Sequence, residues 1–216
     1  MRSWRIAASL LLILGAASPA LAAEWELRLG LGAVSNLASP LTVRQGSFEE
    51  IRVDDADYET RPFESPVYYS VRAGRWDAGR GWELELIHLK LFLSDPPPEI
   101  QRFAVSHGYN LVTVNRGWDL GRVVLRLGAG GVIAHPESTI RGRTAPEEGG
   151  LFDSGYHLTG PAVQGAAEWR LGLGERWVLG VEGKATAARA EVPVAGGEAE
   201  VPSYALHALV GLGYRF

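Results

Sequence analysis

Three side chains in the middle of the sequence could together activate a hydroxyl group. His88, Ser106 and His107 flank the proline-rich stretch 94–99, which cannot donate ladder hydrogen bonds and therefore predicts a turn between two strands. Antiparallel pairing about that turn places His88 opposite Ser106 or His107, with Glu85 nearby. A histidine beside a serine and a carboxylate could carry out nucleophilic acyl transfer. Ser106 and His107 are adjacent, however, and so point to opposite faces of a strand, which favours the alternative of an internal hydrogen-bond network.

A second group of polar residues consists of charged side chains that recur at every second position within apolar stretches. Five acidic and six basic residues share the polar face of their strands: Glu26, Glu83, Glu85, Glu168 and Glu182 with Arg28, Arg72, Lys90, Arg126, Arg170 and Lys184. An unpaired charge inside a closed structure is costly. The nearly balanced set therefore predicts a compensated network that fills a narrow interior, and a selective ion path is the alternative.

Neither a metal site nor a cofactor is predicted. The acidic run Asp54–Asp57 lacks the glycine turn and the terminal glutamate of a calcium loop. His135, His157 and His207 have no metal-ligand spacing, and the chain contains no cysteine for disulfides or thiolate chemistry.

The start of the chain has the features of a secretory signal peptide. Arg2 and Arg5 precede an apolar run at 6–17 and a small-residue cleavage site at 20–22. That run is too short for the ~30 Å hydrocarbon core, so we expect a signal peptide at 1–22 and a single mature domain at 23–216. Without the two arginines, 19 basic and 25 acidic residues leave a net charge of −6, which argues against nucleic acid as a partner.

The remaining chain is dominated by alternation of apolar and polar residues, which predicts β-strands. Eight such stretches are found, at 24–35, 67–76, 82–93, 102–115, 122–134, 157–171, 177–188 and 203–216. The third changes phase around Leu86–Ile87, which predicts a β-bulge there, and the fourth has no clear inward face. Long polar segments at 36–66, 135–156 and 189–202 alternate with short turns. The pattern predicts an all-β fold, an eight-stranded antiparallel up-and-down transmembrane barrel.

Aromatic residues support a membrane rather than an aqueous exterior. Six tryptophans lie at strand ends beside the short turns or the N-terminus: Trp25, Trp76, Trp82, Trp118, Trp169 and Trp177. Indole rings prefer the membrane–water interface, so these residues predict one aromatic girdle. The opposite girdle would contain Tyr69, Phe92, Phe103, Tyr156 and Tyr204. A soluble sandwich or a lipocalin-like barrel is the alternative, but it gives no reason for tryptophans at one rim.

The last strand, which ends in Tyr214 and Phe216, resembles the C-terminal strand of outer-membrane β-barrel proteins. With eight strands, the whole mature chain is similar to the small OmpA/OmpX-like barrels. The resemblance implies an outer-membrane location, with Tyr214 and Phe216 as the signal that the barrel-assembly machinery recognises. It further implies a monomer in contact with outer-membrane lipid and lipopolysaccharide.

The same resemblance implies a non-enzymatic barrel whose surface loops serve adhesion, envelope integrity or defence. One alternative is a lipid-modifying enzyme such as a lipid A deacylase, which would use His88, Ser106 and His107. Another is a narrow ion-conducting barrel. The deacylases carry their histidine and serine two residues apart on one strand face, whereas Ser106 and His107 are neighbours in this sequence.

Overall fold

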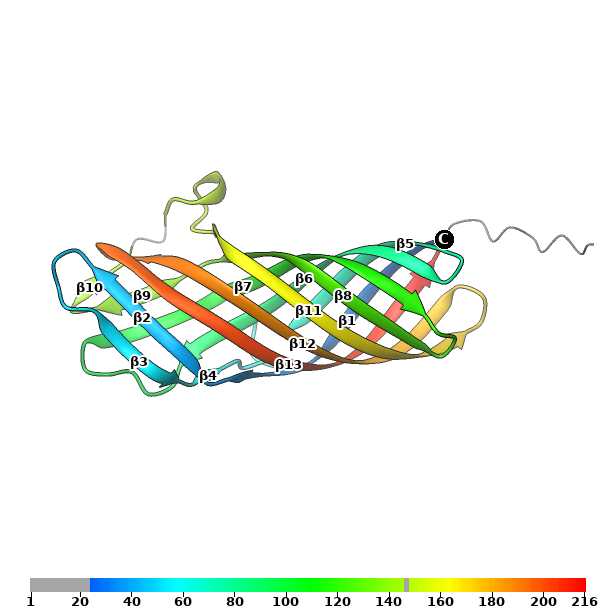
Figure 1. The fold of residues 1–216 in the computed structure, drawn as a ribbon, viewed down its shortest axis with the longest axis horizontal. Helices are drawn as coiled ribbons and strands as arrows, with labels where there is room; N and C mark the ends of the chain where they lie inside the picture. The colour runs from blue at the N-terminus through cyan, green and yellow to red at the C-terminus, as the bar shows by residue number, and fades with distance from the viewer. Residues whose placement is uncertain (1–23, 146–147) are drawn as a thin grey trace, which may run out of the picture.

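The computed structural model describes residues 24–145 and 148–216, so the predicted signal peptide lies outside the described residues. Eight antiparallel strands pair in a closed ring (Figure 1). They are β1 (Glu24–Leu37), β5 (Tyr69–Asp77), β6 (Arg80–Leu93), β7 (Ile100–Asp119), β8 (Val123–Ala134), β11 (His157–Leu173), β12 (Trp177–Val194) and β13 (Gly197–Arg215). The ring closes because β1 pairs with β13 from Glu26↔Arg215 to Leu37↔Tyr204. The predicted all-β, antiparallel, eight-stranded arrangement is confirmed.

Short turns and both described ends of the chain lie at one end of the ring, which we call the turn end (Figure 1). Between β5 and β6, Ala78 and Gly79 have φ angles of 44° and 76°. Positive φ at both central residues is the geometry of a two-residue hairpin turn that matches the twist of its strands. At the same end, the backbone N–H of Phe216 donates to the carbonyl of Trp25 over 2.9 Å.

The opposite end carries additional short strands. These are β2 (Ser39–Gln45), β3 (Ile51–Ala56), β4 (Tyr58–Glu59), β9 (Glu137–Ile140) and β10 (Arg143–Thr144), with a 3₁₀ turn at Leu151–Asp153. β2 continues the pairing along β13 where β1 has ended, and β9 does the same along β7. The segment 189–202 prolongs the β12–β13 hairpin, whose register runs to Val194↔Gly197. The predictions of long loops at 36–66, 135–156 and 189–202 are therefore wrong in part, because neighbouring strand edges provide ladder partners for these backbones.

These segments form what we call the strand extension, built from two sheets. One contains β12, β13, β2 and β3, and the other contains β4, β6, β7, β9 and β10. Buried apolar residues from both sheets pack in one cluster that includes Leu41, Val43, Leu89, Leu91, Val105, Ile140, Val192 and Val201. The hydroxyl of Tyr109 donates to the carbonyl of Val201 over 3.0 Å and links the two sheets. The strand extension thus has an ordinary apolar core.

A clasp of side chains joins the tips of the two sheets. Arg141 donates to the side-chain oxygen of Gln45 over 3.0 Å and to the carbonyl of Glu49 over 2.6 Å. The guanidinium groups of Arg141 and Arg143 lie 4.9 and 5.2 Å from the ring centre of Phe48. Cation–π contacts of this kind hold the β2–β3 tip against the β9–β10 tip.

The β-bulge predicted at Leu86–Ile87 is wrong. β6 pairs with both neighbours without interruption through Ile87, which faces Ser70 on one side and Leu111 on the other. Ile87 therefore points inward like Glu85, because the interior changes from charged to apolar at this level. The irregularity lies on β7 instead, where the register shifts after Leu89.

The bulge on β7 settles the orientation of that strand. Residues 106–108 lie where the pairing shifts, and Gly108 has a φ of 130°, a conformation that suits glycine. Tyr109 and Leu111 are buried in the interior, and Phe103 is 3% exposed within the same apolar cluster. The prediction of Phe103 in the second aromatic girdle is therefore wrong.

Candidate functional site

The outer surface of the ring near the turn end is apolar. Exposed aliphatic residues from seven of its eight strands, each more than 40% exposed, are Leu27, Leu29, Leu31, Leu84, Val114, Leu125, Leu127, Val163, Leu171, Val181, Leu206, Val210 and Leu212. An apolar surface of this extent is exceptional in a protein that faces water. Within the described residues, no helix is long and apolar enough to cross a membrane.

Four of the predicted tryptophans border this apolar surface at the turn end. Trp25, Trp82, Trp169 and Trp177 are 44–60% exposed on the outer face. Trp76 differs, because its strand position points inward and the guanidinium of Arg170 lies 5.3 Å from its ring centre. The prediction of Trp76 in the girdle is therefore wrong, and its indole instead covers the interior at the turn end.

The interior opposite this apolar surface is filled with charge. Nearly all members of the predicted network are present as buried ion pairs, in which five glutamates face four arginines and one lysine. Arg126 lies at its centre, 2.6 Å from Glu83, 2.8 Å from Glu168 and 3.1 Å from Glu182. Arg28, Arg72, Arg170 and Lys184 make the remaining pairs with these acids and with Glu26 and Glu85. Formal charge is balanced within the network.

Neutral polar side chains complete the network on the side that faces the strand extension. Glu85 accepts hydrogen bonds from Ser70, Asn115 and Gln164, and Gln164 also donates to Thr113 over 2.9 Å. Because these side chains connect strands on different sides of the ring, the interior at this level is a packed polar core. This arrangement favours the compensated network over the ion path.

Lys90 does not belong to this network, and its predicted place there is wrong. Leu89 and Leu91 on either side of Lys90 both point into the apolar core, so Lys90 points outward, where its ammonium group donates to the carbonyl of Glu64 over 2.8 Å. Arg61 lies over Phe92 at 4.3 Å, so residues of the segment between β4 and β5 cover this part of the outer face. Sequence alternation predicted Lys90 on the inner face, because it indicated a bulge at Leu86–Ile87 that the structure does not contain.

His88 also lies on the outward face of β6 and does not meet the other two catalytic candidates. Its Nδ1 is 2.8 Å from the side-chain oxygen of Asn110, and its ring stacks on Tyr69 with centres 5.1 Å apart. His88 is buried at 5% exposure, packed against Tyr69 and Asn110.

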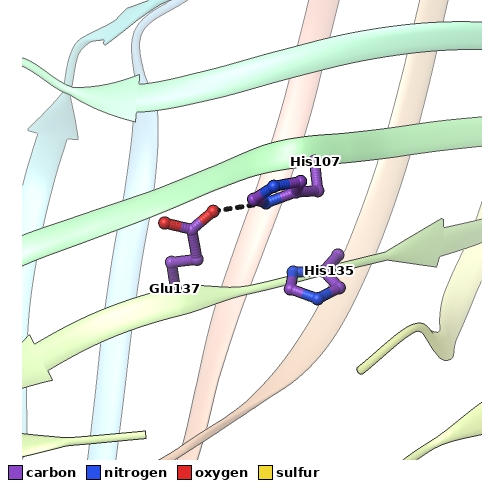
Figure 2. Close-up of side chains that lie close together, drawn as sticks. All are labelled: His107, His135 and Glu137. Carbon is purple, nitrogen blue, oxygen red and sulfur yellow. Dashed lines mark hydrogen bonds and ion pairs between the residues drawn. The ribbon is translucent and has the colours of Figure 1, made fainter. Parts of the chain in front are cut away.

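Ser106 and His107 do converge, on a residue that the sequence did not single out. The carboxylate of Glu137 accepts hydrogen bonds from Ser106 and Arg102, and its Oε1 is 2.6 Å from Nδ1 of His107. The ring of His135 lies beside that of His107, with centres 4.9 Å apart (Figure 2). The expectation that Ser106 and His107 face apart fails because the bulge on β7 turns both toward β9.

Burial and hydrogen bonding act in opposite directions on Glu137. Burial of its side chain raises the pKa of a carboxyl group, but hydrogen bonds from Ser106 and His107 and the charge of Arg102 outweigh that effect. The pKa of Glu137 is therefore lowered, and the group is an anion at neutral pH.

The geometry of Ser106, His107 and Glu137 is not that of a nucleophile relay. In a relay, one imidazole nitrogen contacts the hydroxyl while the other contacts the acid. Here the same atom, Nδ1 of His107, lies 3.3 Å from the Ser106 hydroxyl and 2.6 Å from Glu137. The serine also donates directly to the carboxylate. These contacts orient Glu137 rather than activate the serine.

The cluster was missed in the sequence because its members are distant along the chain. His107 comes from β7, whereas His135 and Glu137 lie at the start of the segment that returns along that strand. The only sequence signal is the short spacing of His135 and Glu137, which is uninformative without the bulge opposite. His157 and His207 do not join them: His207 is interior, bonded to Tyr68 and Thr186.

A closed strand ring with an apolar exterior, a tryptophan border and a charged, filled interior defines an integral outer-membrane β-barrel. The predicted resemblance to small outer-membrane barrels and the predicted location are thereby confirmed.

Three solved structures illustrate the likeness. Ail, the attachment invasion locus protein of Yersinia pestis, is 10% identical, with 89% of this chain and 98% of that chain covered and a TM-score of 0.40. The outer membrane protein AlkL is 10% identical over 100% of this chain and 97% of its own, with a TM-score of 0.47. The outer membrane protease OmpT from Escherichia coli is 9% identical over 89% and 97%, with a TM-score of 0.41. No protein-family model and no curated protein sequence matches the chain.

Proposed function

We propose that this protein is a non-enzymatic outer-membrane barrel that presents its strand extension outside the cell, where it serves adhesion, envelope integrity or defence. The observation that carries the proposal is that the outward face of a single strand changes from apolar to charged along its length. On β12, Leu179 and Val181 point outward near the turn end, whereas Arg189 and Glu191 occupy the same face in the strand extension. An apolar exterior suits lipid and a charged exterior suits water, so the strands leave the membrane at the level of Ala187–Ala188.

The filled interior supports presentation rather than transport. The ion-pair network occupies the membrane part, and the apolar core occupies the strand extension. In the described part of the chain, eight strands enclose a space only wide enough for side chains, which argues against an interior path for a solute.

The other expected features fit the same proposal. Residues 1–22 would direct secretion and be removed, and Tyr214 and Phe216 would be read by the barrel-assembly machinery. The outer face of the ring would contact lipid and lipopolysaccharide. A monomer suffices because the ring has no free strand edge within the apolar surface.

Surface labelling of single-cysteine variants tests this orientation, since the chain has no cysteine of its own. Asp54→Cys places a thiol on the exposed strand β3, and Glu175→Cys places one in a turn at the turn end. In intact cells, a membrane-impermeant maleimide should label the Asp54 variant and spare the Glu175 variant, and both should react after lysis. Labelling of the Glu175 variant alone in intact cells would refute the proposed orientation.

The enzymatic alternative is tested by the lipid itself. We expect the number of acyl chains on lipid A, measured by mass spectrometry, to be the same with the native protein, with Ser106→Ala and without the protein. Acyl chains removed by the native protein but retained with a folded Ser106→Ala variant would replace the proposed function with deacylation.

A further inference from the structure

We propose that His107, His135 and Glu137 bind one divalent transition-metal ion, with zinc as the expected occupant, on the outer face of the strand extension. Each residue offers a ligand atom, and these atoms lie within 4.8 Å of one another. Figure 2 shows the three side chains gathered between β7 and the segment that leads into β9. Two imidazole nitrogens and one carboxylate oxygen are a ligand set that zinc takes in proteins. This site goes beyond the presentation role proposed above and does not depend on it.

His135 provides an independent observation that points to a ligand. It is only 8% exposed, and among the described residues its Nδ1 is buried with no hydrogen-bond partner. A buried polar atom without a partner destabilises a folded protein, because it has lost its hydrogen bonds to water. A metal ion held beside the neighbouring His107 ring would use an imidazole nitrogen that the protein leaves unsatisfied.

The surrounding residues hold the three ligands in place. Arg102 and Ser106 both donate to the carboxylate of Glu137. The hydroxyl of Tyr156 donates to the backbone carbonyl of His107 over 3.0 Å, and its ring meets that of His135 edge-on at 5.0 Å. Metal ligands in proteins are commonly oriented by a surrounding layer of this kind, whose removal weakens binding about 10–100-fold.

The site can accommodate the spacing that zinc requires. Ligand atoms around tetrahedral zinc lie about 3.3 Å apart, since each is ~2.0 Å from the metal. Nδ1 of His107 and Oε1 of Glu137 are 2.6 Å apart and must separate slightly. The side chain of His107 is 60% exposed and can turn outward, whereas Glu137 is fixed by burial and by Arg102. Three protein ligands leave the fourth position for solvent or for the Ser106 hydroxyl.

Calorimetric titration with zinc of the folded, metal-stripped protein in detergent tests the proposal. The protein must carry no histidine tag. We expect one zinc ion per chain. His107→Ala and His135→Ala each remove a ligand, so their loss of affinity should exceed the ~10–100-fold that follows removal of a surrounding residue. His157→Ala is the matched control, since it removes a nearby histidine outside the cluster and should leave binding unchanged. Cobalt substituted for zinc should give the visible absorption of a tetrahedral site in the native protein and the control only.

Folding of each variant is checked by its heat-dependent mobility on gels, so that loss of binding is not confused with loss of structure. The proposal fails if the folded native protein binds no zinc at one equivalent. It also fails if folded His107→Ala and His135→Ala bind zinc as tightly as the control. Surface labelling of Asp54→Cys is a separate readout, so failure of the metal site leaves the proposed orientation standing.

Discussion

The membrane part of the ring and the strand extension are built from the same strands but with opposite chemistry. In the membrane part of β13, Leu206, Val210 and Leu212 point outward and His207 points inward. In the strand extension of the same strand, Glu198 and Glu200 lie on the outward face, while Ala199 and Val201 are buried. The alternation of inward and outward residues continues along β13 through both regions. What changes is the medium outside, which is lipid around the membrane part and water around the strand extension. A barrel in lipid must place its charges inside, whereas a sandwich in water must place them outside.

The difference also changes what holds each region together. The membrane part depends on ion pairs and hydrogen bonds between buried side chains, where the loss of one partner leaves a buried charge. The strand extension depends on apolar packing, where the loss of volume leaves a cavity. Substitutions of the same kind should therefore have different effects in the two regions.

The largest effect is expected at the centre of the charge network. Arg126→Ala leaves Glu83, Glu168 and Glu182 without their shared partner, and should lower the free energy of unfolding by ~3–5 kcal/mol. Urea unfolding in lipid vesicles measures this change. Arg52→Ala is the control in the strand extension, where the pair with Asp54 is exposed and its loss should leave the free energy of unfolding nearly unchanged. Equal losses for both variants would contradict the contrast.

Removal of apolar volume, unlike removal of charge, should destabilise the strand extension more than the membrane part. Leu89→Ala creates a cavity in the core of the strand extension and should lower the unfolding free energy by ~2–5 kcal/mol. Leu127→Ala lies on the lipid-facing surface, where acyl chains fill the space, and should cost roughly 0.5 kcal/mol. The same vesicle experiment measures both, and a large loss for Leu127→Ala alone would mean that its face is not in lipid.

A new charge on the outer face should be tolerated only outside the membrane. Leu125→Arg should lower the unfolding free energy by ~2–4 kcal/mol, because it places a cation in hydrocarbon. Glu191→Arg, on the outward face of the strand extension, should leave the free energy of unfolding nearly unchanged. A silent Leu125→Arg together with a damaging Glu191→Arg would reverse the assignment of the two regions.

The smallest effect is expected at the clasp between the two sheet tips. Arg141→Ala removes the contacts with Gln45, Glu49 and Phe48, and should cost about 0.5–1 kcal/mol. We expect faster amide hydrogen exchange confined to the β2–β3 tip, with unfolding of the whole protein hardly changed. Unchanged exchange at residues 45–51 would show that the clasp does not order the tip.

The alternation of apolar and polar residues was enough to predict the eight ring strands, their antiparallel order and most of the charge network. These follow from local rules, since a strand exposes alternate residues to alternate faces and each face must suit its surroundings. The pairing of Arg126 with Glu83 and Glu182 needed only that all of them share the inner face. The alternation also located the short turns, because a turn interrupts it.

The pairing of the segments in the strand extension depends on contacts between distant parts of the chain. Segments such as 189–202 were predicted to be loops because they are rich in charged residues. Their small apolar residues do alternate with the charged ones, as in the ring, but here the charged face points outward. Their pairing depends on strands distant in the sequence, as in Gly197↔Gln45. The placement of Lys90 and of the cluster of His107, His135 and Glu137 depends on where one bulge lies, on β6 or on β7. A bulge is set by which neighbour takes up the extra residues, and that choice is made only when the strands pair.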